Sequence, residues 1–276
     1  MLTSLSSAVS GLDAYQEQMD IIGNNIANLN TTGFKSATGN LVDAFSNTLQ
    51  AATAATSSVN GTDAMQVGTG VTTASITNNW TQGAINSTGV ASDLAINGNG
   101  FFLVKDNVTG ASYVTQDGTF SLDGSGHLVT ATGMRVQGAS GDIVIDTTGM
   151  PPTSSPTATM VSYSINSQGV ITVNLSDGTA FTRGQLVLQS FTDPQALSSV
   201  GSNLYTYSAA AGPLSAAANP GSGGLGTIQA GALELSNVDL SSQMAALIVA
   251  QRAFEANSKI VTSSDELLQD LVNMKR

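Results

Sequence analysis

Residues able to do acid, base or metal chemistry are few and scattered along this chain. The single histidine, His127, follows Asp123-Gly124-Ser125-Gly126, a run typical of a tight turn. This run has some likeness to a calcium-binding loop, but it lacks the acidic residue that an EF-hand requires at its last position. We therefore expect His127 at the surface of a turn, and we expect no metal site.

Aspartates are the other candidates, because two carboxylates that meet in space can hydrolyse a glycosidic bond. Each lies in a turn sequence, where Asp is expected for local reasons. They are Asp93, Asp106, Asp117, Asp142 and Asp193. Gly98-Asn99-Gly100 leads into an apolar, strand-like run, whereas a phosphate-binding loop opens a helix. The sequence predicts no catalytic residue, no cofactor and no enzyme.

The composition limits the classes of molecule that this chain can bind. Only 10% of the residues are charged, against about 25% in ordinary soluble domains, and a formal net charge of -11 repels nucleic acid and anionic lipid. The chain has no cysteine, so packing alone must hold the fold. We find no secretory signal, and the longest apolar stretch, residues 244–250, is far shorter than the roughly 20 residues of a membrane span. We expect neither nucleic-acid binding nor membrane insertion.

Two long helices are predicted, one at each end of the chain. In the first, over residues 4–28, apolar side chains recur every seven residues and again three positions later, which is an a/d heptad pattern. These are Leu5, Leu12, Met19 and Ile26, followed by Ala8, Tyr15, Ile22 and Leu29. The narrow apolar stripe cannot stabilise such a helix by itself, so it needs a partner.

The second helix is predicted over residues 238–274, which contain no Gly or Pro. Its heptad positions are Leu240, Leu247, Phe254, Val261 and Leu268, with Met244 and Val272 added at either end. Further apolar residues widen this face, namely Ala245, Ala246, Ile248, Val249, Ala253, Ala256 and Ile260. A face of this width suggests more than one helical neighbour.

Between the helices the hydrophobic period changes to two, and Gly follows Asn, Asp or Gln at regular intervals. This pattern predicts antiparallel strands joined by tight turns. The turns are expected at Asn97-Gly98, Asp117-Gly118, Asp123-Gly124, Gln168-Gly169 and Asp177-Gly178.

The expected fold is therefore a mainly β, antiparallel region flanked by long N- and C-terminal α-helices that form a coiled-coil-like terminal domain. We assign residues 1–34 with 236–276 to this helical domain and residues 35–78 to a joint or connector. Residues 79–235 form the β-rich outer domain, with a small extra lobe near 139–182 beside the proline-rich break at 147–159.

The heptads have an ordinary alternative, in which the two helices simply pack on each other within one globule. Their position at the two chain ends, and the apolar residues that a single partner cannot cover, favour additional helices from other copies. We therefore predict a homo-oligomer of many copies. The proposed inter-subunit residues are Leu5, Leu12, Tyr15, Met19, Ile22, Ile26, Leu240, Met244, Leu247, Phe254, Val261 and Leu268.

Three blocks of sequence resemble those of the bacterial flagellar rod and hook family of axial proteins. The first runs through Ser7-Ala8-Val9-Ser10-Gly11-Leu12 and Gly23-Asn24-Asn25-Ile26-Ala27-Asn28 to Thr32-Gly33-Phe34-Lys35. The second contains Asn97-Gly98-Asn99-Gly100-Phe101-Phe102, and the third runs from Ala232-Leu233-Glu234-Leu235-Ser236-Asn237 to Lys259. Together they span the chain.

The resemblance implies a structural subunit that the flagellar export apparatus secretes and that assembles beneath a cap protein. It would stack as a helical tube around a central channel, with other axial proteins at its ends. It also implies a joint between the inner helix and the outer β domain. The joint residues are Asn24, Asn25, Asn28, Thr32, Gly33, Phe34 and Lys35.

Within this family we favour the hook, the extracellular joint that transmits torque, because the ending Leu271-Val272-Asn273-Met274-Lys275-Arg276 resembles that of hook proteins. The alternative is the distal rod of the basal body, a stiff drive shaft that crosses the periplasm, and the short chain length favours it. A secreted surface-binding module and a secreted glycosidase are the alternatives from other classes.

Overall fold

The computed structural model describes residues 2–54, 60–147, 154–155, 158–212 and 217–274. It divides into two compact units. The terminal unit comprises Met1–Ala27, Ser36–Asn79 and Val238–Arg276, and the β unit comprises Asn28–Lys35 and Trp80–Asn237. The predicted fold class is confirmed, because a helix at each end of the chain encloses many antiparallel strands.

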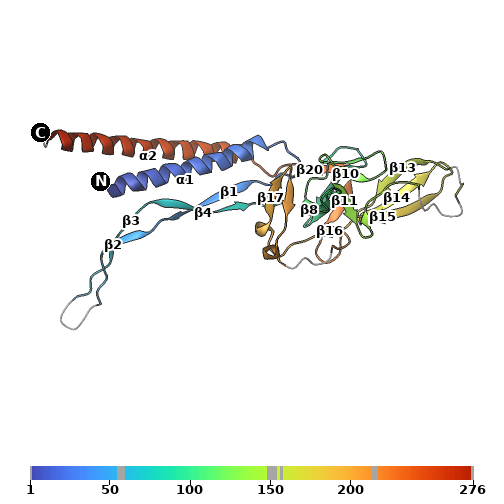
Figure 1. Cartoon of the computed structure of the whole chain (residues 1–276), viewed down its shortest axis with the longest axis horizontal. Coiled ribbons are helices and arrows are strands. Elements are labelled where there is room, and N and C mark those ends of the chain that lie inside the picture. Colours follow the sequence, from blue (N-terminus) through green and yellow to red (C-terminus); the bar gives the residue numbers. More distant parts are fainter. Residues whose placement is uncertain (1, 55–59, 148–153, 156–157, 213–216, 275–276) are drawn as a thin grey trace. The chain divides into compact units, whose positions relative to one another are not determined.

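Both predicted helices are present in the terminal unit. Helix α1 spans Leu2–Ala27, and helix α2 spans Leu240–Met274. The two pack side by side in opposite directions (Figure 1). They approach closely at Gly11, where an added Cβ would lie 2.5 Å from Asn257 Nδ2. Neither helix has a segment apolar enough to cross a membrane.

A two-stranded ribbon completes the terminal unit. Strand β1 (Ala37–Asp43) pairs with β4 (Val71–Asn78), and β2 (Ser46–Gln50) pairs with β3 (Met65–Gly68), both antiparallel. The ribbon lies within residues 35–78, the range assigned to a joint or connector. Alternation of small, β-branched and polar residues favours extended backbone there.

The β unit contains one large sheet and three smaller ones. The large sheet runs in the order β17-β18-β8-β7-β11-β10-β9, with β12 beside β11 and β16 beside β7. Its strands are β7 (Phe101–Lys105), β8 (Ser112–Thr115), β9 (Phe120–Leu122), β10 (Leu128–Thr130), β11 (Arg135–Gly138), β12 (Gly141–Asp142), β16 (Leu188–Gln189), β17 (Ser198–Gly201) and β18 (Leu204–Thr206).

The smaller sheets bring distant segments together. Strand β6 (Leu94–Asn97) pairs with β19 (Thr227–Ala230), and β5 (Ile85–Ser87) pairs with β20 (Ala232–Glu234). A three-stranded sheet, in the range expected for an extra lobe, is formed by β13 (Met160–Ile165), β14 (Val170–Leu175) and β15 (Ala180–Gln185). Most of the proline-rich break at 147–159 lies outside the described residues. Short 3-10 helices occupy Pro194–Ala196 and Ala209–Ala211.

The main hydrophobic core lies within the β unit, where alternate residues of the strands face inward. Phe102, Val104, Val136 and Leu188 are fully buried, and the ring of Phe102 meets that of Phe120 edge to face at 5.1 Å. No comparable cluster of buried side chains is found among the described residues of the helices. The β unit is thus stabilised by its own packing.

Three of the five expected turns join paired strands, and two do not. Asp123-Gly124 joins β9 to β10, while Gln168-Gly169 and Asp177-Gly178 join the strands of the small sheet. Asn97-Gly98 was expected to close a hairpin, but β6 pairs with β19, from the far end of the region, instead of with β7. Asp117-Gly118 likewise leads from β8 to β9, which do not pair. Local turn chemistry is the same in both cases, so it does not reveal the partner strand.

Gly118 gives a test of this arrangement, because its backbone passes directly over β6. A Cβ there would lie 1.6 Å from the backbone oxygen of Leu94. We predict that Gly118→Ala lowers the free energy of unfolding by about 3 kcal/mol, as backbone atoms cannot move aside like a flexible side chain. Urea unfolding of the purified chain measures this loss. Gly124→Ala is the matched control, since its Cβ would meet no atom within 4 Å. Equal stability of the two variants would contradict the tight approach.

Candidate assembly surface and junction

The two faces of α1 are both covered within the terminal unit. One face packs against α2 and the other against strands β1 and β4 of the ribbon. On the ribbon side, the Ser10 hydroxyl accepts a hydrogen bond from Val71 N–H at 3.3 Å, and Gly70 approaches too closely for any side chain. The heptad residue Ile22 is buried. The other predicted residues of this helix are half-buried, namely Leu5, Leu12, Tyr15, Met19 and Ile26.

Helix α2, in contrast, has only α1 as an extensive neighbour among the described elements. Its predicted heptad residues divide into two groups. Leu247, Phe254, Val261 and Leu268 are half-buried, whereas Leu240 and Met244 are 41% and 43% exposed. The intramolecular pairing of the helices, which the sequence left open, therefore accounts for the first group.

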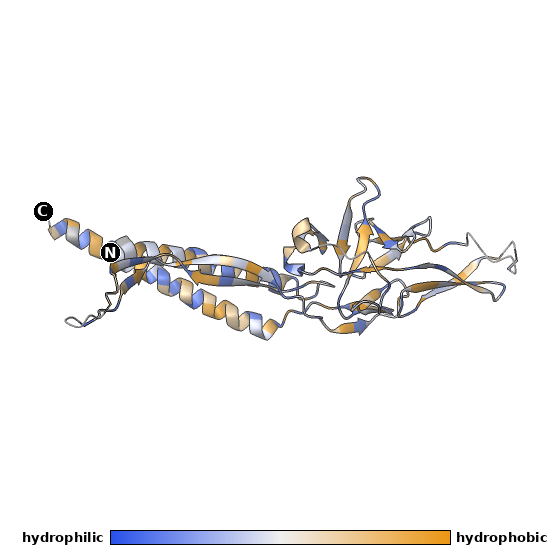
Figure 2. Ribbon diagram, turned by 90° about the horizontal axis from the view of Figure 1, so that it is seen from below, coloured by the Kyte–Doolittle hydropathy of each residue, from blue (hydrophilic) through white to orange (hydrophobic). Residues whose placement is uncertain are grey.

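A second apolar stripe on α2 has no cover in the structure. Its members recur at spacings of seven and four residues, so they lie on one side of the helix. They are Val249, Ala256, Ile260, Leu267 and Met274. The large side chains among them are 45% to 82% exposed. Hydrophobic residues accordingly appear all along α2 in Figure 2. We call these five residues the free stripe.

The first joint residues stabilise the end of α1. Asn25 is almost fully buried, and its side-chain amide bonds to both backbone groups of Ala37. Its Nδ2 also donates to Gln243 Oε1 of α2 at 3.2 Å. Asn25 therefore links the end of α1, the start of the ribbon and the first turn of α2. Asn24 is exposed.

The remaining joint residues lie in the β unit, where some of their hydrogen bonds are local and others reach residues distant in sequence. Asn28 accepts from the Thr31 hydroxyl, and the Thr32 hydroxyl donates to Asp117 Oδ1 at 2.9 Å. Gly33, at φ 67°, donates its N–H to the Glu234 backbone oxygen at 2.9 Å. Its left-handed conformation, and the Asp117 backbone 2.8 Å from any added Cβ, both require glycine.

Lys35 and Glu234 form the most buried ion pair of the described structure. Their Nζ and Oε1 atoms are 2.7 Å apart, and the side chains are 2% and 4% exposed. Lys35 Nζ also donates to the Thr81 backbone oxygen at 3.0 Å, and Glu234 Oε1 accepts from Gly83 N–H at 2.7 Å. Both charges are therefore compensated by several hydrogen bonds, as burial requires.

This network, which we call the junction, connects three separate passages of the chain within the β unit. Asn237 adds two further bonds, from its N–H to the Phe34 oxygen and from its Nδ2 to the Thr81 oxygen. Residues 33–35, 81–83 and 234–237 are thereby held together. Each of these segments adjoins a point where the chain passes into or out of the terminal unit.

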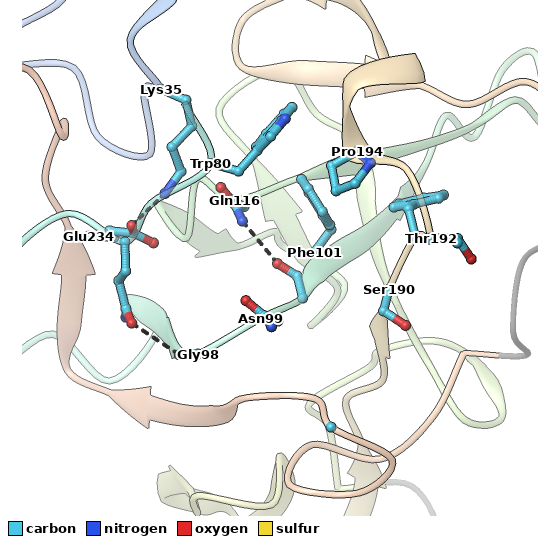
Figure 3. A pocket seen from close by; sticks show the side chains of 14 residues that line it. Lys35, Trp80, Gly98, Asn99, Phe101, Gln116, Ser190, Thr192, Pro194 and Glu234 are labelled. Atoms are coloured by element: carbon cyan, nitrogen blue, oxygen red, sulfur yellow. Dashed lines mark hydrogen bonds and ion pairs between the residues drawn. The ribbon is translucent and has the colours of Figure 1, made fainter. Parts of the chain in front are cut away.

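A cavity of about 370 Å³ opens beside the ion pair (Figure 3). Its wall includes Trp80, whose ring meets Phe101 and Tyr205 edge to face at 5.3 Å and 5.2 Å. Gln116 donates to the Gly100 backbone oxygen at 3.2 Å. Lys35 and Glu234 both line this wall, and each is held by a backbone hydrogen bond as well as by the other.

The candidate catalytic aspartates have structural hydrogen-bond partners, most of them within their own turn or strand pair, and Asp117 also binds Thr32. Asp106 accepts from Thr109 and Val108, and these hydrogen bonds hold the pKa of its carboxyl below the ordinary value. Asp142 pairs with Arg135 at 3.0 Å. The described residues contain no group of three acidic, histidine or cysteine side chains that could hold a metal ion.

His127 is less exposed than a turn-surface residue should be. Its side chain is 17% exposed, with Nδ1 3.2 Å from Asp123 Oδ2. Backbone hydrogen bonds, the first from His127 N–H, and the histidine's charge lower the pKa of Asp123. His127 forms an isolated antiparallel β-bridge with Val144. The turn sequence could not predict this contact, because Val144 lies well beyond the turn.

Sequence reasoning missed Glu234 as the partner of Lys35. Glu234 alternates with Ala232 in β20. In the structure both side chains face inward, which places a carboxylate in the interior. A buried carboxylate needs a cation. Lys35 is one of only eight basic residues, but the sequence does not show which of them it meets.

Three family models match the chain. Residues 5–35 match the flagella basal body rod protein model, and residues 95–173 match the D1 domain of the flagellar hook protein FlgE/F/G. Residues 229–274 match the C-terminal model of the flagellar basal body rod FlgEFG proteins. The Bacillus subtilis flagellar basal-body rod protein FlgG is 41% identical over 276 residues, covering all of both chains. The chain belongs to the flagellar rod and hook family.

Two further relatives show the range of this family. The rod protein FlgG of Borreliella burgdorferi is 35% identical over 281 residues, with both chains covered completely. The hook protein FlgE of the same organism is 27% identical over 444 aligned positions. The chain is thus a structural component of the flagellar axis and not an enzyme.

The buried pair of the junction generates a stability prediction. Lys35→Met leaves the Glu234 carboxylate buried without a cation, and we expect the free energy of unfolding to fall by about 3–5 kcal/mol. Urea unfolding of the full chain, below the concentration at which it assembles, measures the change.

Arg252→Met is the control, because its pair with Glu255 is 77% and 58% exposed and should contribute less than about 1 kcal/mol. The double variant Lys35→Met with Glu234→Leu should regain much of the lost stability, since no unpaired charge remains. If Lys35→Met cost no more than Arg252→Met, the junction would not have the role described.

Proposed function

We propose that this chain is a subunit of the flagellar rod, a stiff shaft that transmits torque, and not of the hook. The observation that supports this is the length of the match. The rod relatives in Bacillus and Borreliella align with it end to end over 276 and 281 positions.

The hook, which the sequence favoured, fits less well. The Borreliella hook protein aligns over 444 positions against 276 residues here, so 168 positions have no counterpart in this chain. Among the described residues after Gly138, the largest element is the three-stranded sheet of β13, β14 and β15.

We further propose that copies polymerise through the free stripe of α2. Contact of water with apolar side chains such as Leu267 and Val249 is unfavourable. Each large apolar side chain contributes about 1.5–3 kcal/mol of stabilisation when it is buried. Leu247, Phe254, Val261 and Leu268 act within the subunit, where they face α1. The assembling surface that we propose therefore contains none of the twelve heptad residues first proposed.

The rod assignment predicts where the protein lies in the cell. A small epitope tag inserted at Val108, which is 91% exposed in a loop of the β unit, should leave the fold intact. We expect immunogold label on the straight rod of isolated basal bodies. Label on the curved hook would contradict the assignment.

The assembly surface predicts a second result. Leu267→Asp should abolish polymerisation, because a carboxylate would enter an apolar contact between subunits at a cost of several kcal/mol. Sedimentation and electron microscopy of the purified chain, with motility in cells, report the loss.

Thr262→Asp is the matched control, an exposed polar residue of α2 outside the free stripe. It adds the same charge to the same helix and should assemble normally. Normal tubes from Leu267→Asp would reject the free stripe as an assembly surface.

A further inference from the structure

All the basic residues within the two helices lie on α2. Helix α1 contains Asp13, Glu17 and Asp20 and no basic residue. The basic residues within α2 are Arg252 and Lys259, and its acidic residues are Glu255, Asp265, Glu266 and Asp270. The described side chains form no ion pair between α1 and α2. The acidic residues of α1 and the basic residues of α2 thus do not meet within one subunit.

The acidic residues of α1 form a row on its outer surface. Asp13, Glu17 and Asp20 lie at spacings of four and three residues, so they share one side of the helix, and all three are exposed. None has a side-chain partner among the described residues. Three carboxylates this close repel one another, and a cation brought near them would relieve that repulsion.

The basic residues of α2 lie along one edge of the free stripe. Arg252 is three residues after Val249, and Lys259 is three residues after Ala256, a spacing that makes each pair neighbours on the helix surface. Lys259 has no side-chain partner among the described residues. Arg252 contacts only Glu255, in an exposed pair of the weak kind.

The two charged rows match in spacing. Arg252 and Lys259 are seven residues apart, as are Asp13 and Asp20, and seven residues of helix span about 10 Å. The helices run in opposite directions in one subunit, and subunits of a polar tube share one direction. A neighbour's α1 would then place Asp13 level with Lys259 and Asp20 level with Arg252.

We infer that the free stripe of α2 docks on α1 of a second copy, with Arg252 and Lys259 against the acidic row. This inference rests on the proposed function and adds the partner helix and its register. The contact is heterologous, with different surfaces on the two copies, so it propagates into an open helical assembly without closing as a dimer. Burial of the free stripe supplies affinity, and the ion pairs select partner and register.

Charge reversal with rescue tests the pairing. Arg252→Glu with Lys259→Glu should prevent assembly of the full chain, as should Asp13→Lys with Asp20→Lys. All four changes in one chain should restore assembly to at least half of the wild-type yield by sedimentation. Lys105→Glu, at an exposed position of the β unit, controls for the Lys→Glu change itself. A fourfold variant no better than either double variant would overturn the inference, as would normal assembly of a double variant.

Crosslinking gives a second measurement that does not depend on disruptive variants. The chain has no cysteine, so Asp13→Cys with Lys259→Cys introduces the only two thiols. A short thiol-to-thiol crosslinker should convert assembled material into a ladder of covalent multimers, whereas Asp13→Cys with Lys105→Cys should give none. Assembled material without a ladder, or crosslinks to a different protein in isolated basal bodies, would overturn the second copy as occupant.

The inference and the proposed function fail in different ways. If Leu267→Asp is defective but the double charge variants assemble normally, only the pairing with α1 is wrong. If Leu267→Asp itself assembles normally, the free stripe is not the assembly surface, and both this inference and the proposed route of polymerisation fail, while the rod assignment keeps its separate test.

Discussion

The terminal unit depends on one constraint, which is that α2 carries more apolar surface than a single neighbouring helix can cover. Helix α1 lies between α2 and the ribbon, and its remaining exposed side carries the acidic residues Asp13, Glu17 and Asp20. Helix α2 has no second layer, and its free stripe of Val249, Ala256, Ile260, Leu267 and Met274 is exposed. An apolar surface of this kind needs a partner. For a chain of the flagellar rod and hook family, further copies of itself are the natural source.

The junction meets a different requirement, which is to hold together the segments that lead from one unit to the other. The chain passes between the two units four times. Lys35, Glu234 and their backbone partners connect the adjoining segments inside the β unit, in a site with almost no access to water. These segments are therefore fixed to one another within the β unit.

Much of the architecture could be predicted from sequence, because the strongest signals were periodic and local. The heptads predicted both helices to within a few residues of their ends. The turns at Asp123-Gly124, Gln168-Gly169 and Asp177-Gly178 were also predicted correctly as hairpins. Contacts between residues distant along the chain could not be predicted from the sequence. The β6–β19 pair, the Lys35–Glu234 pair and the partly buried His127 each depend on residues distant along the chain. The division of α2 between an inner and a free face also required the structure, since heptad spacing cannot show which neighbour a face meets.

The most direct test of the account is hydroxyl-radical footprinting of the free stripe before and after assembly. In verified monomers, Val249, Leu267 and Met274 should be oxidised readily, in keeping with exposures of 67%, 53% and 82%. In assembled tubes their oxidation should fall by at least fivefold, while that of Val108 in the β-unit loop stays unchanged. Equal oxidation of the stripe in the two states would contradict the claim that assembly covers it.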